Sequence, residues 1–102
     1  MSEMAVVRYE TRADAAAENH RLVERVFLEL NETAPQGLAY AAWRLADGVS
    51  FLHIVLREGE HNPLTRSAAF ADFRRGLADR VVGPPVRTDA ALVGSYRFSG
   101  LF

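Results

Sequence analysis

The sequence predicts an α+β fold whose strands and helices follow one another in the order β-α-β-β-α-β. The segment Gly37–Arg57 has apolar, β-rich flanks on either side of Asp47-Gly48, which is typical of a hairpin. Two segments with apolar residues at helical spacing lie before and after it. A short β-rich run opens the chain and a longer one ends it. This order predicts a single ferredoxin-like domain over residues 1–102, with both helices on one face of a four-stranded antiparallel sheet.

The first strand is expected at Met4–Tyr9 and the first helix from about Arg12 to Asn31. Thr11 and Asp14 have the spacing of a capping box at the start of this helix. The apolar residues of the helix recur at helical spacing: Ala15, Leu22, Val23, Val26, Phe27 and Leu30.

The central hairpin is expected to turn through a two-residue type I′ loop at Asp47-Gly48, so that Trp43 faces Leu52 and Ala42 faces His53. Alternation then divides the side chains between two faces. The aliphatic face holds Ala39, Ala41, Trp43, Leu45, Ser50, Leu52, Ile54 and Leu56. The mixed face holds Leu38, Tyr40, Ala42, Arg44, Val49, Phe51, His53 and Val55. We expect the aliphatic face to pack in the core.

A polar loop at Glu58–Pro63 precedes the second helix, which is expected over Ser67–Val81 with Asn62 or Ser67 as its cap. A Gly-Pro-Pro sequence stops this helix. The last strand is expected over Val86–Phe98.

Composition excludes several classes of function. The net charge of −1, with both signs scattered along the chain, favours neither nucleic acid nor a membrane surface as a partner. The chain has no cysteine, and its three histidines are dispersed, so we expect no metal site. No signal-peptide or membrane-spanning pattern is found, and we expect a cytoplasmic protein.

The mixed face has no cover within the predicted fold. Leaving Tyr40, Phe51 and Val55 in water would forfeit several kcal/mol, at about 25 cal/mol per Å² of apolar surface. We therefore expect a homodimer in which two sheets pack face to face, rather than a monomer in which a ligand groove covers this surface.

The hairpin GLAY…LADGVSFLHIV, the NPL turn at Asn62 and the VGSYRF segment resemble dimeric α+β barrel proteins similar to antibiotic biosynthesis monooxygenases. The resemblance implies a homodimer that oxidises a small aromatic or polyketide-like compound without a cofactor. Enzymes of this kind use Asn, Trp, Tyr and Arg side chains, which points to Asn62, Trp43, Tyr40 and Arg44. A haem-degrading branch uses Asn, Trp and His, but Trp43 and His53 are expected on opposite faces.

His53 is the candidate catalytic base, with Tyr40 and Arg44 positioning the substrate or stabilising an oxyanion. Tyr40 is expected diagonal to His53 on the mixed face. The alternative is an interior histidine that is hydrogen-bonded at the dimer seam.

Further candidates for substrate binding are Phe51, Trp43, Asn62 and His61. For Trp43 the favoured interpretation is core packing, because the rest of its face is aliphatic, and capping and solvation account for the two loop residues. The alternative function is a non-catalytic homodimer that binds a small ligand or serves in assembly.

Overall fold

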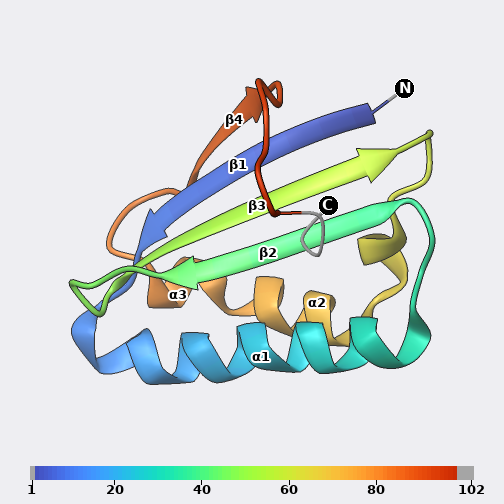
Figure 1. The fold of residues 1–102 in the computed structure, drawn as a ribbon. Coiled ribbons are helices and arrows are strands. Elements are labelled where there is room, and N and C mark those ends of the chain that lie inside the picture. Colours follow the sequence, from blue (N-terminus) through green and yellow to red (C-terminus); the bar gives the residue numbers. More distant parts are fainter. Residues whose placement is uncertain (1, 99–102) are drawn as a thin grey trace.

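The computed structural model describes residues 2–98 and has the predicted order of elements. The elements are β1 (Ser2–Glu10), the 3₁₀ helix η1 (Ala13–Ala15), α1 (Ala16–Thr33), β2 (Leu38–Arg44), β3 (Ser50–Glu58), the 3₁₀ helix η2 (Pro63–Arg66), α2 (Ala68–Arg75), α3 (Leu77–Arg80) and β4 (Val86–Ala90). The strands form an antiparallel sheet in the order β2-β3-β1-β4, and the helices cover one face of it (Figure 1). The predicted ferredoxin-like fold is confirmed.

The register of the hairpin between β2 and β3 is also as predicted. Trp43 pairs with Leu52, and Ala42 pairs with His53. Successive side chains of a strand point to opposite faces, so the division into an aliphatic and a mixed face holds. Trp43 and His53 therefore lie on opposite sides of the sheet.

The loop of this hairpin differs from the predicted two-residue turn. Its strands close at Leu45 and Ser50, where the Leu45 N–H donates to the Ser50 carbonyl at 2.8 Å. Gly48 has a positive φ of 79°, but Asp47 does not, so a type I′ turn at these two residues is wrong. The Asp47 carboxylate instead accepts from the Ser50 N–H at 2.8 Å. The loop gains one residue on each side, which leaves the strand register unchanged.

The helices cover the mixed face, and the expectation that the aliphatic face forms the core is wrong. The buried core cluster comprises Tyr9, Val23, Val26, Phe51 and Phe73. Trp43, on the aliphatic face, is 38% exposed. The expectation failed because both faces are largely apolar, so hydrophobicity alone did not say which of them the helices would cover.

The start of the first helix was also predicted incorrectly. Neither η1 nor α1 has a side-chain cap. Thr11 instead forms a β-bridge with Val81, and its hydroxyl donates to the Val49 carbonyl at 3.3 Å. The capping box fails because Thr11 still belongs to the sheet layer.

The second helix is interrupted at Gly76, which separates α2 from α3. Both predicted caps are present: the Asn62 side chain accepts from the first turn of η2, and the Ser67 hydroxyl accepts from the Phe70 N–H at 3.0 Å. A Cβ added at Gly76 would lie 2.9 Å from Nη1 of Arg80. The glycine therefore leaves the space that the Arg80 guanidinium occupies.

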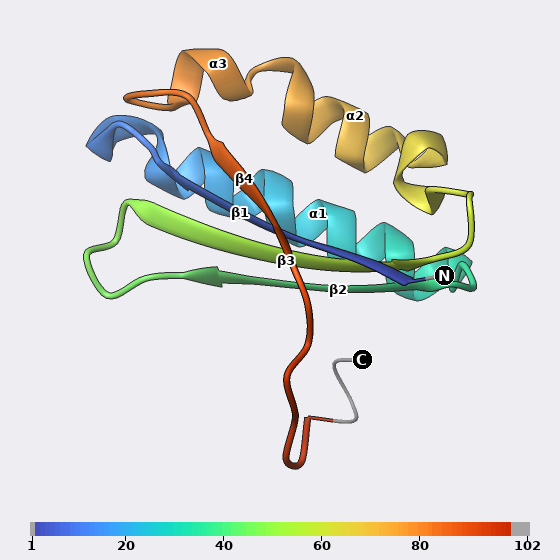
Figure 2. The same cartoon turned by 90° about the horizontal axis from the view of Figure 1, so that it is seen from above.

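The last strand is shorter than predicted and ends at Ala90. Ala90 pairs with Met4, close to the start of β1, so few residues of β1 remain to pair with a longer β4. Residues 91–98 leave the sheet on the side away from the helices (Figure 2). This C-terminal arm, residues 91–98, exposes four large apolar side chains: Leu92, Val93, Tyr96 and Phe98.

Candidate functional site

A pocket of about 470 Å³ lies between the mixed face of the sheet and the segment that runs through η2, α2 and α3. The surface of its walls is mainly apolar, although half of the sixteen lining residues have polar or charged side chains. The sheet contributes Glu3, Ala5, Val7, Tyr9, Tyr40, His53, Val55, Arg57 and Arg87, and the opposite wall contributes Asn62, Leu64, Phe70, Phe73, Arg74, Leu77 and Pro85. An apolar pocket with a few convergent polar groups is the usual form of a small-molecule site.

Five side chains form a continuous chain of hydrogen bonds that leads to this pocket. Arg80 Nε donates to Asn19 Oδ1 at 2.9 Å, and Asn19 Nδ2 donates to the Tyr9 hydroxyl at 2.9 Å. The Tyr9 hydroxyl lies 2.8 Å from His53 Nε2. The Tyr40 hydroxyl lies 2.6 Å from His53 Nδ1. We call this series from Arg80 to Tyr40 the buried hydrogen-bond chain.

The sheet register and the helices together bring these groups into contact. Tyr9 pairs with Phe51 across β1 and β3, and their rings stack at 5.5 Å. His53, two residues further along β3, is 3% exposed and stacks on the Phe73 ring from α2 at 5.5 Å. Aromatic rings therefore enclose the imidazole on two sides, which holds it in one orientation between the two hydroxyl groups.

Burial keeps the histidine and the two tyrosines of the buried hydrogen-bond chain uncharged. It lowers the pKa of His53 from 6.5 to about 4, because a charged imidazolium would lose its hydration. Burial raises the pKa of Tyr9 to about 12, against opposing effects from the Asn19 hydrogen bond and the Arg80 charge. It also raises the pKa of Tyr40. At neutral pH the one charge in the buried hydrogen-bond chain is therefore that of Arg80.

Two of the predicted catalytic residues lie together in the pocket. His53 and Tyr40 are diagonal neighbours on β3 and β2, as the register predicted. Both imidazole nitrogens are engaged by tyrosine hydroxyls, and His53 lies beneath the helices rather than at an open sheet face. The alternative of a histidine at a seam between two sheets is therefore wrong in its location, because the helices cover this face.

Arg44, the third predicted catalytic residue, does not line the pocket. Its Nε donates to the Gly48 carbonyl at 2.8 Å, and its guanidinium lies 5.9 Å from the centre of the Phe51 ring. Phe51 is only 2% exposed and packs behind Tyr9 instead of lining the pocket. Both residues stabilise the hairpin end of the sheet.

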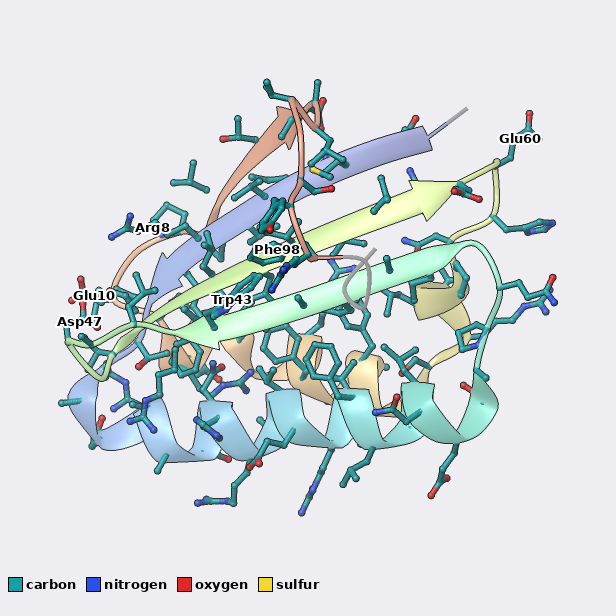
Figure 3. All side chains as sticks on the ribbon, in the orientation of Figure 1. Arg8, Glu10, Trp43, Asp47, Glu60 and Phe98 are labelled. Carbon is teal, nitrogen blue, oxygen red and sulfur yellow. The ribbon has the colours of Figure 1, made fainter. Side chains whose placement is uncertain are left out.

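Trp43 lies on the side of the sheet away from the helices, the side on which Phe98 also lies (Figure 3). It therefore does not contact the pocket, and the expectation that it packs in a helix-covered core is wrong as well. Asn62 does line the pocket, although its Oδ1 accepts from the Leu64 N–H at 3.1 Å. His61 lines a separate depression of about 620 Å³ between the end of α1 and η2.

Sequence reasoning missed three members of the buried hydrogen-bond chain: Tyr9, Asn19 and Arg80. Asn19 gave a usable signal, because it is a polar residue among the buried positions of α1. A polar side chain in an apolar stripe usually has a hydrogen-bonding partner in the core. Arg80 gave no comparable signal, since Asn19, its side-chain partner in the series, lies far away in the sequence.

The charged residues of the pocket are mostly basic. Arg57, Arg74 and Arg87 line it together with Glu3, the one acidic residue there. Arg57 pairs with Glu3, and Arg87 pairs with Asp89 at 3.1 Å. Arg74 makes no ion pair with a carboxylate among residues 2–98, and its guanidinium lies 6.0 Å from the centre of the Phe70 ring. The three arginines give the lining a positive balance on a chain whose net charge is −1.

Within residues 2–98, no group of three or more histidine and acidic side chains is arranged to hold a metal ion. No helix in the same part of the chain has the length and apolar character needed to cross a membrane.

A four-stranded antiparallel sheet with helices on one face defines a ferredoxin-like α+β domain. Within this class, the chain has the fold of structures described as antibiotic biosynthesis monooxygenases, so the resemblance suggested by the sequence is confirmed for the fold. One such structure has a TM-score of 0.67 and 13% identity, covering 92% of this chain and 100% of that one.

Two further solved structures are similar over nearly the whole chain. Rv0793 from Mycobacterium tuberculosis has a TM-score of 0.73 and 18% identity, covering 93% of this chain and 98% of its own. A variant of SnoaB, a cofactor-independent oxygenase from Streptomyces nogalater, has a TM-score of 0.65 and 15% identity, covering 94% and 97%. The amino-acid sequence itself matches neither a family model nor a curated protein.

Proposed function

We propose that this protein is a cofactor-independent, monooxygenase-like enzyme that oxidises a small aromatic or polyketide-like compound in the pocket beneath α2. The observation that carries the proposal is the Tyr40 hydroxyl. It lies at the pocket end of the buried hydrogen-bond chain, 2.6 Å from His53 in a largely apolar wall. The shared fold with the oxygenase SnoaB supports this reading.

The proposed reaction needs only the substrate and O₂. A phenol or enolisable ketone gives a proton to water at the pocket and becomes an enolate, whose electron-rich ring carbon reduces O₂ and forms a C–O bond to it. The resulting hydroperoxide, once protonated, loses water as its O–O bond breaks and the ring carbon becomes a carbonyl. One CH₂ group and one O₂ thus give one C=O group and one water.

Tyr40 contributes by hydrogen bonding to the enolate oxygen. Against a largely apolar wall, a positioned donor stabilises developing negative charge more than it would in water. His53 acts through Tyr40, because both of its nitrogens are engaged by tyrosine hydroxyls. This role differs from the direct base predicted from the sequence.

The basic lining narrows the proposed substrate class. Arg74 is exposed at the pocket and forms no ion pair with a carboxylate within residues 2–98, so it is available to an anionic group on the ligand. A carboxylate on the aromatic compound would bind there while its phenolic or ketone oxygen reaches Tyr40. We therefore expect acidic hydroxy-aromatic compounds to bind better than their uncharged analogues.

Oxygen uptake with a panel of hydroxyanthrones and hydroxynaphthoates tests the proposal. We expect turnover by the wild-type protein and a decrease of about 10²-fold in kcat for Tyr40→Phe, the size found when one oxyanion donor is removed. Tyr96→Phe is the matched control, since Tyr96 lies in the exposed C-terminal arm. Tight binding of these compounds without oxygen uptake would contradict the proposal and favour the alternative of a non-catalytic ligand-binding protein.

We also propose that the protein is a homodimer through the aliphatic face, rather than through the mixed face expected from the sequence. No helix of the described chain covers the aliphatic face, which includes the half-exposed Trp43. The C-terminal arm projects from the same side and exposes apolar residues that need a cover. A second copy supplies both an apolar sheet and an apolar arm, so the two surfaces are self-complementary. Sedimentation as a monomer at micromolar concentration would contradict this proposal.

A further inference from the structure

We infer that Arg80, acting through Asn19, sets the direction of every hydrogen bond in the buried chain, so that Tyr40 presents its O–H to the pocket and the ligand must offer an accepting oxygen. The inference specifies the ligand chemistry of the proposed active site and rests on that proposal only where it concerns the ligand. The direction of the hydrogen bonds follows from the geometry of the side chains alone.

The first link has only one polarity. A guanidinium donates hydrogen bonds and accepts none. Arg80 is 5% exposed, and its Nε donates to Asn19 Oδ1 at 2.9 Å. Its Nη2 donates to the Phe73 carbonyl at 2.6 Å, which holds the guanidinium in place. The Asn19 amide is thereby oriented with its oxygen toward Arg80 and its NH₂ group toward Tyr9.

The second link follows from the first. Asn19 Nδ2 donates to the Tyr9 hydroxyl at 2.9 Å, so the Tyr9 oxygen is an acceptor in this contact. The remaining polar neighbour of this hydroxyl within residues 2–98 is His53 Nε2, at 2.8 Å. If Nε2 carried a proton, it would also donate to Tyr9, and the Tyr9 proton would have no acceptor among residues 2–98. A hydroxyl proton left without an acceptor is unfavourable, and the opposite arrangement avoids it. Tyr9 therefore donates to Nε2.

The hydrogen bond between His53 and Tyr40 determines whether Tyr40 offers a donor or an acceptor to the pocket. A neutral imidazole has one donor and one acceptor nitrogen, so Nδ1 carries the proton once Nε2 accepts. Nδ1–H donates to the Tyr40 oxygen at 2.6 Å. Tyr40 has no other hydrogen-bond partner within the described residues, and its side chain lines the pocket. The Tyr40 O–H is therefore left for a ligand.

This polarity selects ligands by the oxygen that they present. A carbonyl, enolate or phenolate oxygen accepts from Tyr40, whereas a group that can only donate finds no acceptor there. The chain also permits one proton to pass to the ligand. Tyr40 gives up its proton, Nδ1–H replaces it, and Tyr9 protonates Nε2. The net change is one proton transferred from Tyr9, whose phenolate is left beside Asn19 and the Arg80 charge.

Asn19 and Arg80 act here as positioning residues, and the tautomer of His53 reports their effect directly. In ¹⁵N-labelled protein at pH 8, NMR distinguishes a protonated from an unprotonated ring nitrogen. We expect wild-type His53 to carry its proton on Nδ1. A proton on Nε2 would overturn the inference, whatever the variants show.

Asn19→Asp tests the origin of the polarity at nearly constant shape. A carboxylate only accepts, so Tyr9 would donate to it and would accept from His53 Nε2–H instead. We expect the proton to move from Nδ1 to Nε2 and the Tyr40 O–H to turn toward His53. Arg80→Lys is the conservative control, because an ammonium also only donates, and it should keep the proton on Nδ1. A folded Asn19→Asp protein with an unchanged tautomer would overturn the role of Asn19.

A binding measurement tests the ligand class without requiring turnover. Naphthoquinone carboxylates have carbonyl oxygens that only accept, and we expect them to bind roughly fivefold more weakly to Tyr40→Phe, the effect of losing one neutral hydrogen bond. Unchanged affinity would overturn the ligand part of the inference. If the tautomer is as expected but no compound consumes oxygen, the proposed function fails while the polarity stands. If a compound is turned over but His53 carries its proton on Nε2, the proposed function stands and the inferred polarity fails.

Discussion

Replacing His53 by glutamine should reduce the loss of folding stability that this protein undergoes when the pH is lowered. Burial lowers the pKa of His53 from 6.5 to about 4 in the folded chain. Between these two values the unfolded chain binds a proton that the folded chain does not. The free energy of unfolding therefore decreases as the pH falls through this range, and His53 causes no further loss below about pH 4.

The size of this effect follows from the same two pKa values. The difference between 6.5 and about 4 corresponds to about 3 kcal/mol when one pKa unit is taken as about 1.4 kcal/mol. At pH 5 most of the difference has been expressed, so we expect the wild-type protein to lose about 2 kcal/mol between pH 7.5 and pH 5 through His53 alone. His53 is 3% exposed, and solvent screening therefore does not reduce this figure appreciably.

Urea unfolding at a series of pH values measures this loss, at one fixed protein concentration so that self-association does not change the result. Glutamine does not titrate, so His53→Gln should lose about 2 kcal/mol less than the wild type over the same interval. The acidic residues titrate in both proteins, and their contribution cancels in the difference. His61→Gln, a replacement in the exposed loop, should follow the wild-type curve. Equal losses for the wild type and His53→Gln would refute the claim that burial keeps this imidazole neutral.

Three further substitutions test other parts of the structure. Ser67→Ala should destabilise the protein by about 1 kcal/mol in urea unfolding, because the hydroxyl caps α2 and also donates to Glu29; no loss would contradict the capping role. Gly48→Ala should also cost about 1 kcal/mol in the same assay, since the glycine has a φ of 79° and no neighbouring atom would obstruct a Cβ. Ile54→Asp, on the aliphatic face, should shift the protein to monomers in sedimentation while the far-ultraviolet circular dichroism is retained; an unchanged dimer would exclude this face as the interface.

The register of the central hairpin was predictable although its loop was not. Both the two-residue loop and the observed loop, which closes at Leu45 and Ser50, pair Trp43 with Leu52. The Asp47 carboxylate caps the end of the loop with hydrogen bonds to the Ser50 backbone and side chain, and an Asp-Gly sequence is compatible with either arrangement. The register of the strands therefore depended only on the position of the loop centre at Asp47-Gly48, and it could be predicted without knowledge of the turn type.

The end of the chain was less predictable, because a β-rich sequence forms a strand only where a neighbour can pair with it. The run after Ala90 is as apolar as many strands, but β1 begins too close to Met4 to pair with much more of it. The sequence pattern indicates that a segment tends to be extended, but it does not indicate whether a neighbouring strand has residues free to pair with it. For this reason the pattern predicted a strand to Phe98 where the structure has an exposed arm.

The most consequential wrong prediction concerned which face of the sheet the helices cover. It was wrong because the hydrogen-bonding needs of the polar residues on that face were not considered. Tyr40 and His53 suggested a surface left open for a partner or a ligand. In the structure they form part of the buried hydrogen-bond chain, whose other members are Tyr9, Asn19 and Arg80. A polar residue in the apolar stripe of a helix needs a buried hydrogen-bond partner, and so does a polar residue in an apolar strand. When the helix packs on the strand, the two residues can hydrogen-bond to each other. Asn19 in the stripe of α1 therefore contained the information that this helix covers the face with the tyrosines and the histidine. Only the three-dimensional arrangement, however, shows that Arg80 begins the series and that the free O–H of Tyr40 ends it.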